Sequence, residues 1–268
     1  MALTLDFTDK VVLVTGSSSG IGEATVIMFA QLGAKVVVHG RNRQNVAQVA
    51  AKCRDVSPKH YQPLELVADV ANEQEVDKMM DTIIGHYDNQ LDVVVNNAGK
   101  GGGESNASLA EFDQFMTINL RSCYQICLRA YPLLTRSPTG GVIINNSSIC
   151  SLKPFPHSLS YCVAKAGLDM LTRNLALLWG PQGIRVNAVN PGQIQTPIWE
   201  NATGLTKEER DILWQAVCRK TPIGRQGFAD DIAKAIVFLA SNRDSGFTTG
   251  ITMKIDGGFL DSADLIYN

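Results

Sequence analysis

The chain has 268 residues, a length that suits one α/β domain, and its residues are 45% hydrophobic and 19% charged. This composition supplies a large apolar core and excludes an intrinsically disordered chain. Lys and Arg number 24 against 26 Asp and Glu, a formal net charge of -2, so the basic excess typical of nucleic-acid binders is missing.

The first half of the chain alternates short apolar runs with amphipathic segments. We expect strand Val11–Val14, helix Ile21–Leu32, strand Val36–Val38, helix Asn45–Cys53, strand Leu64–Val67, helix Glu73–Tyr87 and strand Leu91–Val95. The second half continues with helix Leu109–Arg136, strand Val142–Ile144, helix Ser160–Leu178, strand Val186–Val189, helix Asp230–Ser241 and strand Ile251–Ile255. Strands that are apolar throughout and alternate with helices are typical of a parallel sheet covered on both faces. We therefore expect an α/β fold, a Rossmann-like, doubly wound sheet of seven parallel strands in a single domain.

Membrane, secretion and metal signals are missing from the sequence. No apolar run approaches the roughly 20 residues that cross a bilayer, and the N-terminal segment lacks the basic start of a secretory signal. The last residues match no retention or peroxisomal signal, so we expect a cytoplasmic protein without a membrane span. The six Cys residues contain no C-x-x-C pair, and the four His residues have no metal-ligand spacing with them. We expect free thiols and no metal.

A glycine-rich segment, T-G-S-S-S-G-I-G at residues 15–22, joins the first strand to the first helix. Glycines let a pyrophosphate approach the backbone closely, and the free N–H groups and dipole at a helix start hold negative charge. A plain strand-to-helix turn is the alternative, and the spacing is not that of a P-loop. The predicted phosphate contacts are Gly16, Ser17, Ser18, Gly20, Ile21 and Gly22.

Further motifs follow the later strands: N-N-A-G at residues 96–99, Ser148 before a Tyr161-x-x-x-Lys165 pattern, Pro191-Gly192, and D-G-G at residues 256–258. With the glycine-rich segment, this set resembles the short-chain dehydrogenase/reductase family, which includes 3-oxoacyl-ACP reductases and carbonyl reductases. The resemblance spans residues 7 to 259. It implies one domain over residues 1–268, with a cofactor half about 1–145, a catalytic and substrate half about 146–268, and a variable lid about 196–225.

Four side chains resemble the catalytic set of that family. Tyr161 and Lys165 lie one helical turn apart on one face, and an ammonium beside a phenol lowers its pKa and makes it a usable general acid/base. Ser148 ends the fifth strand, where a hydroxyl can bond a substrate carbonyl oxygen, whereas Ser147 points the other way. The resemblance implies that Asn119 holds a water linking Lys165 to solvent; an exposed polar residue on the long helix is the alternative.

The resemblance also implies cofactor contacts at other strand ends. Asn97, Ala98 and Gly99 would line the adenosine side, and Asp69 with Val70 would meet the adenine. Asp69 has an alternative role as a cap for the helix that starts at Glu73. Beyond these, Tyr161 and Lys165 would hold the nicotinamide ribose, and the nicotinamide carboxamide would meet Pro191, Gly192, Ile194 and Thr196.

The end of the second strand bears on which nicotinamide cofactor is used. Gly40 occupies the position where NAD-preferring members carry an acid, and the planar fork of the next residue, Arg41, suits a 2′-phosphate. Ser17 and Ser18 add hydroxyl donors. We therefore expect NADPH/NADP+ rather than NADH. The alternative is that Arg41 and Arg43 are solvated charges at the start of a helix.

The implied activity is that of an NADP(H)-dependent oxidoreductase transferring hydride between the nicotinamide and a small-molecule carbonyl or secondary alcohol. A catalytically silent NADP(H)-binding regulator or scaffold is the alternative, and the four-residue set disfavours it. The long helices Leu109–Arg136 and Ser160–Leu178 are the usual subunit contacts of the family, so a homotetramer or homodimer is expected. The sequence assigns neither a substrate nor roles for Lys100, His157 and the loop at 101–103.

Overall fold

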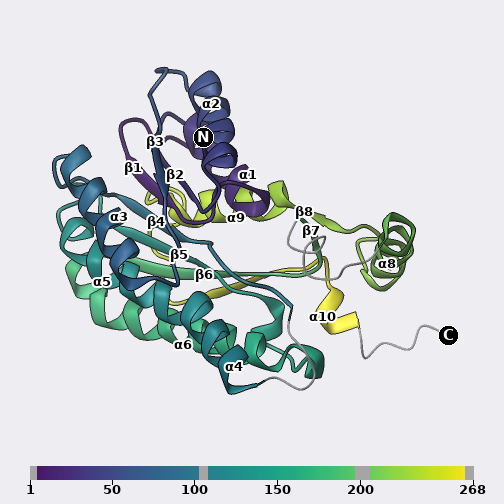
Figure 1. Ribbon diagram of the computed structural model, residues 1–268. Coiled ribbons are helices and arrows are strands. Elements are labelled where there is room, and N and C mark those ends of the chain that lie inside the picture. The colour runs from purple at the N-terminus through teal and green to yellow at the C-terminus, as the bar shows by residue number, and fades with distance from the viewer. Residues whose placement is uncertain (1–4, 103–107, 197–205, 263–268) are drawn as a thin grey trace.

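The structure, a computed structural model, describes residues 5–102, 108–196 and 206–262. Seven parallel strands form one sheet in the order β3-β2-β1-β4-β5-β6-β9 (Figure 1). They are β1 (Val11–Val14), β2 (Lys35–Gly40), β3 (Leu64–Val67), β4 (Val93–Asn96), β5 (Val142–Asn146), β6 (Arg185–Pro191) and β9 (Thr252–Ile255). The strand order reverses between β1 and β4, and ligands of such sheets bind at the carboxyl ends beside this point. The predicted seven-stranded, doubly wound fold is confirmed.

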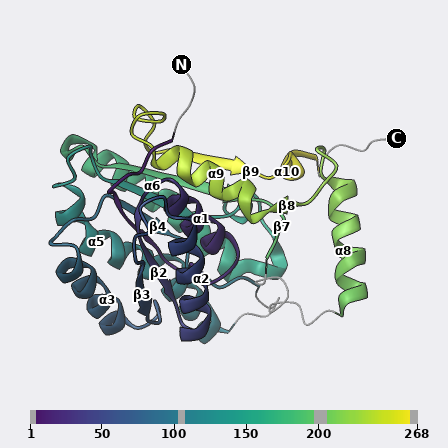
Figure 2. The same cartoon turned by 90° about the horizontal axis from the view of Figure 1, so that it is seen from above.

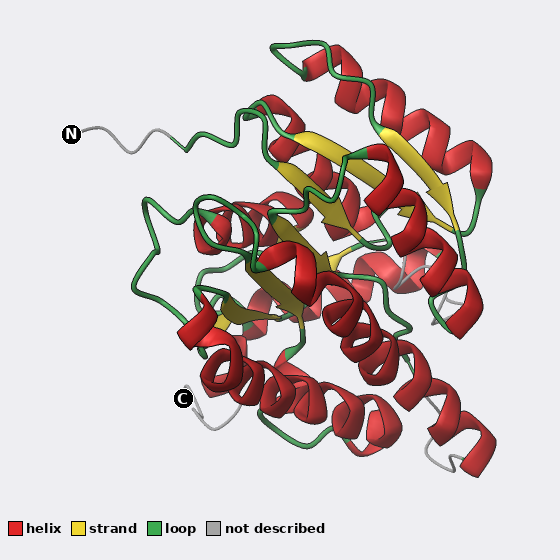
Figure 3. Cartoon of the chain, turned by 90° about the vertical axis from the view of Figure 1, so that its left-hand side faces the viewer, coloured by secondary structure: helices red, strands yellow, loops and turns green. Residues whose placement is uncertain are grey.

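Helices cover both faces of the sheet (Figure 3). One face carries α1 (Gly20–Gln31), α2 (Arg43–Val56) and α9 (Ala229–Ala240), and the other carries α3 (Glu73–His86), α5 (Ser122–Leu134) and α6 (Leu159–Trp179). Side chains alternate along β1, so Val12 and Val14 pack under the first group and Val11 and Leu13 under the second. Two apolar cores therefore hold the sheet and fix the positions of its strand ends.

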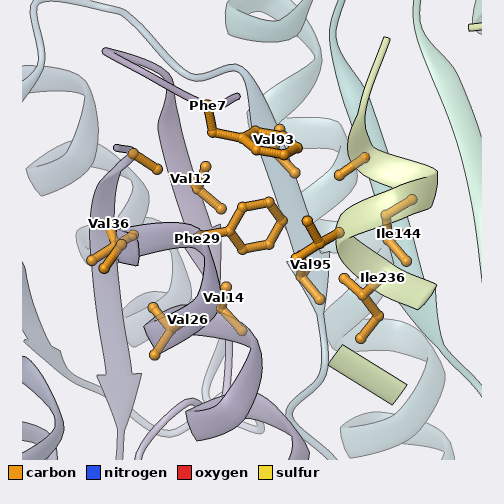
Figure 4. Packing of buried hydrophobic residues seen from close by; sticks show 14 of the residues in the cluster. Phe7, Val12, Val14, Val26, Phe29, Val36, Val93, Val95, Ile144 and Ile236 are labelled. Carbon is orange, nitrogen blue, oxygen red and sulfur yellow. The ribbon is translucent and has the colours of Figure 1, made fainter. Parts of the chain in front are cut away.

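The core under α1 is centred on the ring of Phe29, which Figure 4 shows between β1, β4 and α9. Phe29 is fully buried and meets Phe7 edge-on, with ring centroids 4.9 Å apart. Burying a side chain of this size contributes about 1.5–3 kcal/mol. This packing anchors α1, whose first turn borders the glycine-rich segment.

The predicted helix Leu109–Arg136 is not continuous. It consists of α4 (Leu109–Met116), a π-helical turn η1 (Thr117–Arg121) and α5. The Asn119 side-chain amide donates to Phe115 O at 3.2 Å, the carbonyl that the Asn119 backbone N–H would bind in a regular α-helix. This competition accounts for the π turn, a feature often found at functional sites.

The predicted lid region, about 196–225, contains one helix among its described residues, α8 (Lys207–Lys220). A capping box starts it: Thr206 Oγ1 accepts from Glu209 N at 3.3 Å, and Thr206 N donates to Glu209 Oε2 at 2.8 Å. Figure 2 shows α8 at the side of the body, beyond the small pair of strands β7 (Ile194–Gln195) and β8 (Gly227–Phe228). The short helix α10 (Phe259–Ser262) follows β9, and no helix in the described ranges is long and apolar enough to cross a membrane.

Candidate active site

The glycine-rich turn (residues 15–22) packs against the N-N-A-G segment after β4. Gly16 has a φ of +63°, a left-handed conformation that favours glycine, and a Cβ there would lie 2.8 Å from Ala98 Cα. Asn97 Nδ2 donates to Thr15 O at 2.9 Å and to Gly16 O at 3.1 Å. The two predicted cofactor segments are therefore in direct contact.

The first turn of α1 is free to receive an anion. Its N-cap residue, Ser19, makes no side-chain cap, and the helix starts at Gly20 beside the turn. Uncapped N–H groups at a helix start carry partial positive charge, which fits a dinucleotide diphosphate. Gly22 lies behind them, where a Cβ would come within 2.4 Å of Asn97 Nδ2.

The predicted hydroxyl donors Ser17 and Ser18 have different surroundings. The Ser17 hydroxyl is fully buried and accepts a hydrogen bond from His39 N at 2.9 Å, so it does not face a ligand. Ser18 is half-buried and covers Gly40, where a Cβ would lie 2.4 Å from Ser18 Oγ and 2.7 Å from its Cβ. Any side chain at position 40 would therefore displace Ser18.

Arg41 lies exposed beside this corner, and its guanidinium forms no hydrogen bond or ion pair within the described part of the chain. Arg43 is also exposed, at the first position of α2. Asp69 Oδ1 accepts from Ala71 N at 2.9 Å next to the buried Val70. The cap of α3 is Asn72 rather than Asp69, so capping does not explain the acid at position 69.

Ser148, Tyr161 and Lys165 meet at the carboxyl end of β5. Tyr161 and Lys165 share a face of α6, with Lys165 Nζ 5.6 Å from the Tyr161 ring centroid and 2.7 Å from Asn146 O. Ser148 caps the 3-10 turn η2 (Ile149–Ser151), and its hydroxyl lies close enough to the Tyr161 phenol to lower the pKa of Tyr161. Ser147 turns inward and donates to Lys165 O at 3.2 Å. The geometry thus separates the two serines.

The electrostatics of this cluster depart from the prediction made for Tyr161. Burial raises the pKa of Tyr161, Cys150 adds to the rise, and the hydrogen bond with Ser148 opposes it. Burial also lowers the pKa of Lys165, against the influence of Cys123 and Asp169. Burial, rather than the Lys165 ammonium, is therefore the largest influence on the phenol, because Lys165 Nζ is directed at Asn146 O.

Asn119 is fully buried in η1, which excludes an exposed helix position. Its Oδ1 accepts from Lys100 N at 3.1 Å and its Nδ2 donates to Lys100 O at 3.2 Å. A Cβ on Gly99 would lie 2.9 Å from Asn119 Oδ1 and 3.8 Å from Lys165 Nζ. Asn119 and Lys165 therefore both approach the same glycine.

The segment after β6 packs against the D-G-G motif. Pro191 ends the strand, and a Cβ on Gly192 would lie 2.5 Å from Asp256 Cβ, so this glycine permits close packing against the D-G-G motif. Ile194 is buried in β7, and Thr196 is the last described residue before the gap. The lid residues 197–205 lie outside the described residues.

Sequence reasoning missed a buried polar cluster behind Ser148. Asp169, 4% exposed, accepts from Asn190 Nδ2 at 2.9 Å and from Ser151 Oγ at 2.6 Å through its Oδ2. Asn190 Nδ2 also donates to Ser148 O at 3.0 Å. The i, i+4 spacing from Tyr161 through Lys165 continues to Asp169, and this signal could have located the carboxyl. Within the described ranges, no group of three or more His, Cys, Asp or Glu side chains could hold a metal ion.

Comparison with known proteins places this geometry among oxidoreductases. The family profile described as enoyl-(acyl carrier protein) reductase matches residues 16–260. Glucose 1-dehydrogenase of Gluconobacter oxydans is 37% identical over 254 residues, covering 94% of this chain and 92% of that protein.

Two similar solved structures contain a nicotinamide cofactor. L-sorbose reductase from Gluconobacter frateurii, complexed with NADPH and L-sorbose, has a TM-score of 0.89 and 31% identity, with 96% of this chain and 99% of that chain covered. A 7α-hydroxysteroid dehydrogenase complexed with NADH and 7-oxo glycochenodeoxycholic acid has a TM-score of 0.86 and 30% identity, with 95% and 96% covered.

Proposed function

Because the chain belongs to the short-chain dehydrogenase/reductase family, an oxidoreductase family that uses a nicotinamide cofactor, we propose that it transfers hydride between NADP(H) and a small-molecule carbonyl or secondary alcohol. The observation that carries this proposal is the convergence of Ser148, Tyr161 and Lys165 at the same carboxyl edge of the parallel sheet as the uncapped start of α1. The residues around that convergence fit a dinucleotide whose nicotinamide would supply the hydride.

In the reductive direction, negative charge grows on the substrate carbonyl oxygen. Ser148 and Tyr161 donate hydrogen bonds to that oxygen, and Tyr161 gives it the proton. Lys165 would hold the ribose hydroxyls, and its ammonium would favour the phenolate that remains after the proton has left. Asn119 holds the water that restores the proton by way of Lys165. The cofactor contacts would be those predicted from the sequence, except that the hydroxyl and the amide of Ser17 are already bonded to His39.

The preference for NADP(H) rests on the corner formed by Ser18, Gly40 and Arg41. An acid at position 40, which would bind a free ribose 2′-hydroxyl, has no room beside Ser18. Arg41 is exposed and has its guanidinium fork available for a 2′-phosphate. These two observations support NADPH over NADH.

We further propose a homo-oligomer formed through α4, α5 and α6. These helices border a surface hollow of about 660 Å³ whose lining includes the apolar side chains of Met116, Leu120 and Met170 beside the polar ones of Asp113, Arg121 and Asn174. Leu177, at 81% exposure, and Leu178, at 64%, extend the apolar surface along α6. Light scattering would measure the mass, and Met170→Arg should lower it by separating subunits. The cytoplasmic location and the boundary between the two halves near residue 145 stay predictions.

The experiment that tests the activity is NADPH oxidation against a carbonyl panel of sugars, diketones, steroids and acyl thioesters. Wild type is compared with Tyr161→Phe, and each substrate is also run with NADH. Turnover that needs the phenol hydroxyl and NADPH supports the proposal. Equal turnover in both proteins contradicts the mechanism. NADPH binding without turnover across the panel favours the silent regulator instead.

A further inference from the structure

His39 is a buried side chain that the proposed chemistry does not use. It lies in β2 next to Gly40 and is 2% exposed. Its Nδ1 is 3.0 Å from Gly16 N, and its Nε2 is 3.1 Å from Ala68 O. A backbone N–H only donates and a carbonyl only accepts, so Nδ1 is the acceptor and Nε2 carries the proton. The ring is therefore a neutral bridge between the turn after β1 and the loop after β3.

The backbone of His39 engages the same turn. His39 O accepts from Ser17 N at 2.8 Å, and His39 N donates to Ser17 Oγ at 2.9 Å. Gly16 and Ser17 therefore give their amides to the protein. The following amides, from Ser18 to Ile21, have no hydrogen-bond partner among the described residues.

We propose that His39 is a positioning residue of the cofactor site, which fixes the turn so that the amides of residues 18–21, and not those of Gly16 and Ser17, face the diphosphate. This inference rests on the proposed function. The same ring ties Gly16 to Ala68, which directly precedes the predicted adenine contacts Asp69 and Val70. One side chain thus sets the spacing between the diphosphate turn and the adenine loop.

A small or aliphatic residue cannot make both contacts, because only imidazole places an acceptor and a donor on opposite sides of one rigid ring. Burial lowers the pKa of His39 to about 4, while the bond to Ala68 O and the charge of Asp69 oppose the change. The ring therefore stays uncharged at neutral pH and keeps its lone pair on Nδ1 for the Gly16 amide.

Two substitutions separate the two contacts. His39→Asn keeps an acceptor near the place of Nδ1 and loses the Nε2 donor, whereas His39→Gln keeps a donor near Nε2 and loses the acceptor. We expect His39→Gln, which loses the contact to the turn itself, to raise the Kd for NADPH about tenfold, and His39→Asn, which loses only the contact to Ala68, to raise it about threefold. Nicotinamide fluorescence titration of the cofactor-free protein measures both values without turnover.

Amide hydrogen exchange in the same cofactor-free proteins reports the turn directly. In His39→Gln the Gly16 amide should exchange faster than in wild type, while the Ser17 amide, held by the backbone of position 39, stays protected. His86→Gln, on α3 and away from the turn, is the matched control and should change neither Kd nor exchange. At saturating NADPH, the kcat of His39→Gln should stay within about twofold of the wild-type value, because Ser148, Tyr161 and Lys165 are unchanged in this variant.

A wild-type Kd for NADPH in folded His39→Gln, or unchanged Gly16 exchange, would overturn the inference. If His39→Gln does not fold, the milder His39→Asn carries the test through its Kd relative to His86→Gln. Failure of the proposed function looks different: wild type itself would then bind neither NADPH nor NADH, while Gly16 would still lose its protection in His39→Gln.

Discussion

The glycine-rich turn after β1 and the serine loop (residues 147–151) after β5 lie at the same edge of the sheet and are held by different chemistry. Behind the turn is His39, an uncharged ring bonded to backbone groups on both sides. Behind the serine loop is Asp169, a carboxyl that contacts Ser151 and Asn190. Both side chains are buried. His39 holds the turn through the amide of Gly16, and Asp169 holds the backbone of Ser148 through Asn190 and Ser151.

His39 is uncharged and Asp169 is a carboxyl, and this difference matches the charge of the group that lies, or is expected, next to each side chain. The turn is proposed to receive a diphosphate, and a carboxylate directly behind it would repel that ligand. The serine loop lies near Lys165, where the negative charge of Asp169 opposes the fall in pKa that burial causes. His39 is thus uncharged behind the turn where the anionic diphosphate is expected, whereas Asp169 carries negative charge near the Lys165 ammonium.

Lys165 is proposed to hold the nicotinamide ribose and to favour the Tyr161 phenolate, so its loss should have the largest effect. Lys165→Met removes the ribose contact and the favourable charge beside Tyr161. We expect kcat/KM to fall on the order of 10³-fold, from the usual range for general acid–base groups. Steady-state kinetics with varied NADPH measures it, and Lys234→Met on the exposed side of α9 serves as the control. A fall in kcat with unchanged KM for NADPH would assign Lys165 to the serine side alone.

The neutral His39 ring should make the protein sensitive to acid. Because the pKa of His39 is about 4 in the folded protein against 6.5 for a free histidine, the unfolded chain binds more protons between these pH values. Stability contributed by the neutral ring is complete above pH 6.5 and falls as pH drops toward 4, by about 3 kcal/mol. Urea unfolding at pH 7, 6 and 5 measures this slope. Between pH 7 and pH 5 the free energy of unfolding of wild type should fall by about 2 kcal/mol more than that of His39→Asn, and parallel curves would contradict the assigned burial effect.

The role of Asp169 is tested by Asp169→Ala and Asp169→Asn. Alanine removes every contact to Ser151 and Asn190, so we expect kcat to fall about tenfold to thirtyfold with the Kd for NADPH unchanged. Asparagine restores hydrogen bonding but not charge, and should recover part of kcat. Single-turnover rates and fluorescence titration separate the two quantities. Equal loss in both variants would show that charge, rather than hydrogen bonding to the loop, is the contribution of Asp169.

The smallest expected effect concerns the corner beside the turn. Arg41→Ala should reduce the preference for NADPH over NADH about tenfold, the size of one charge-assisted contact. The Kd for NADH should not move. Arg43→Ala, one exposed arginine further along, is the matched control. An unchanged cofactor ratio in Arg41→Ala would remove the 2′-phosphate assignment.

Much of the sheet was predictable because most of its strands are short, buried and apolar; the expected Val11–Val14 coincides with β1, in which all four residues are buried. The π turn at Asn119 was not, because apolar periodicity does not register a side chain that competes for a backbone carbonyl. The helix α8 was missed inside a segment rich in charged residues, although Thr206 and Glu209 form a capping signal that the sequence displays.

The candidate site also has features that the sequence predicted and features that it did not. Motifs along the chain predicted which strand ends would meet, since parallel strands end at one edge of the sheet. The inward turn of Ser17 and the contacts of His39 depend on the adjacency of β1, β2 and β3, which spacing along the sequence does not encode. Asp169 had a readable spacing, but its partner Asn190 comes from β6.

The π turn also limits how this chain can tolerate insertions and deletions. Removing one residue from 117–121 would restore a continuous α-helix and rotate everything after it by about 100°. The stripe of Ile126, Ala130 and Leu133 that now faces the sheet would turn away from it. The extra residue of the π turn therefore sets which side of α5 faces the sheet. Deleting it would remove both the buried position of Asn119 and the packing of α5. A deletion scan across α4 and α5 should find this segment the least tolerant of single-residue loss.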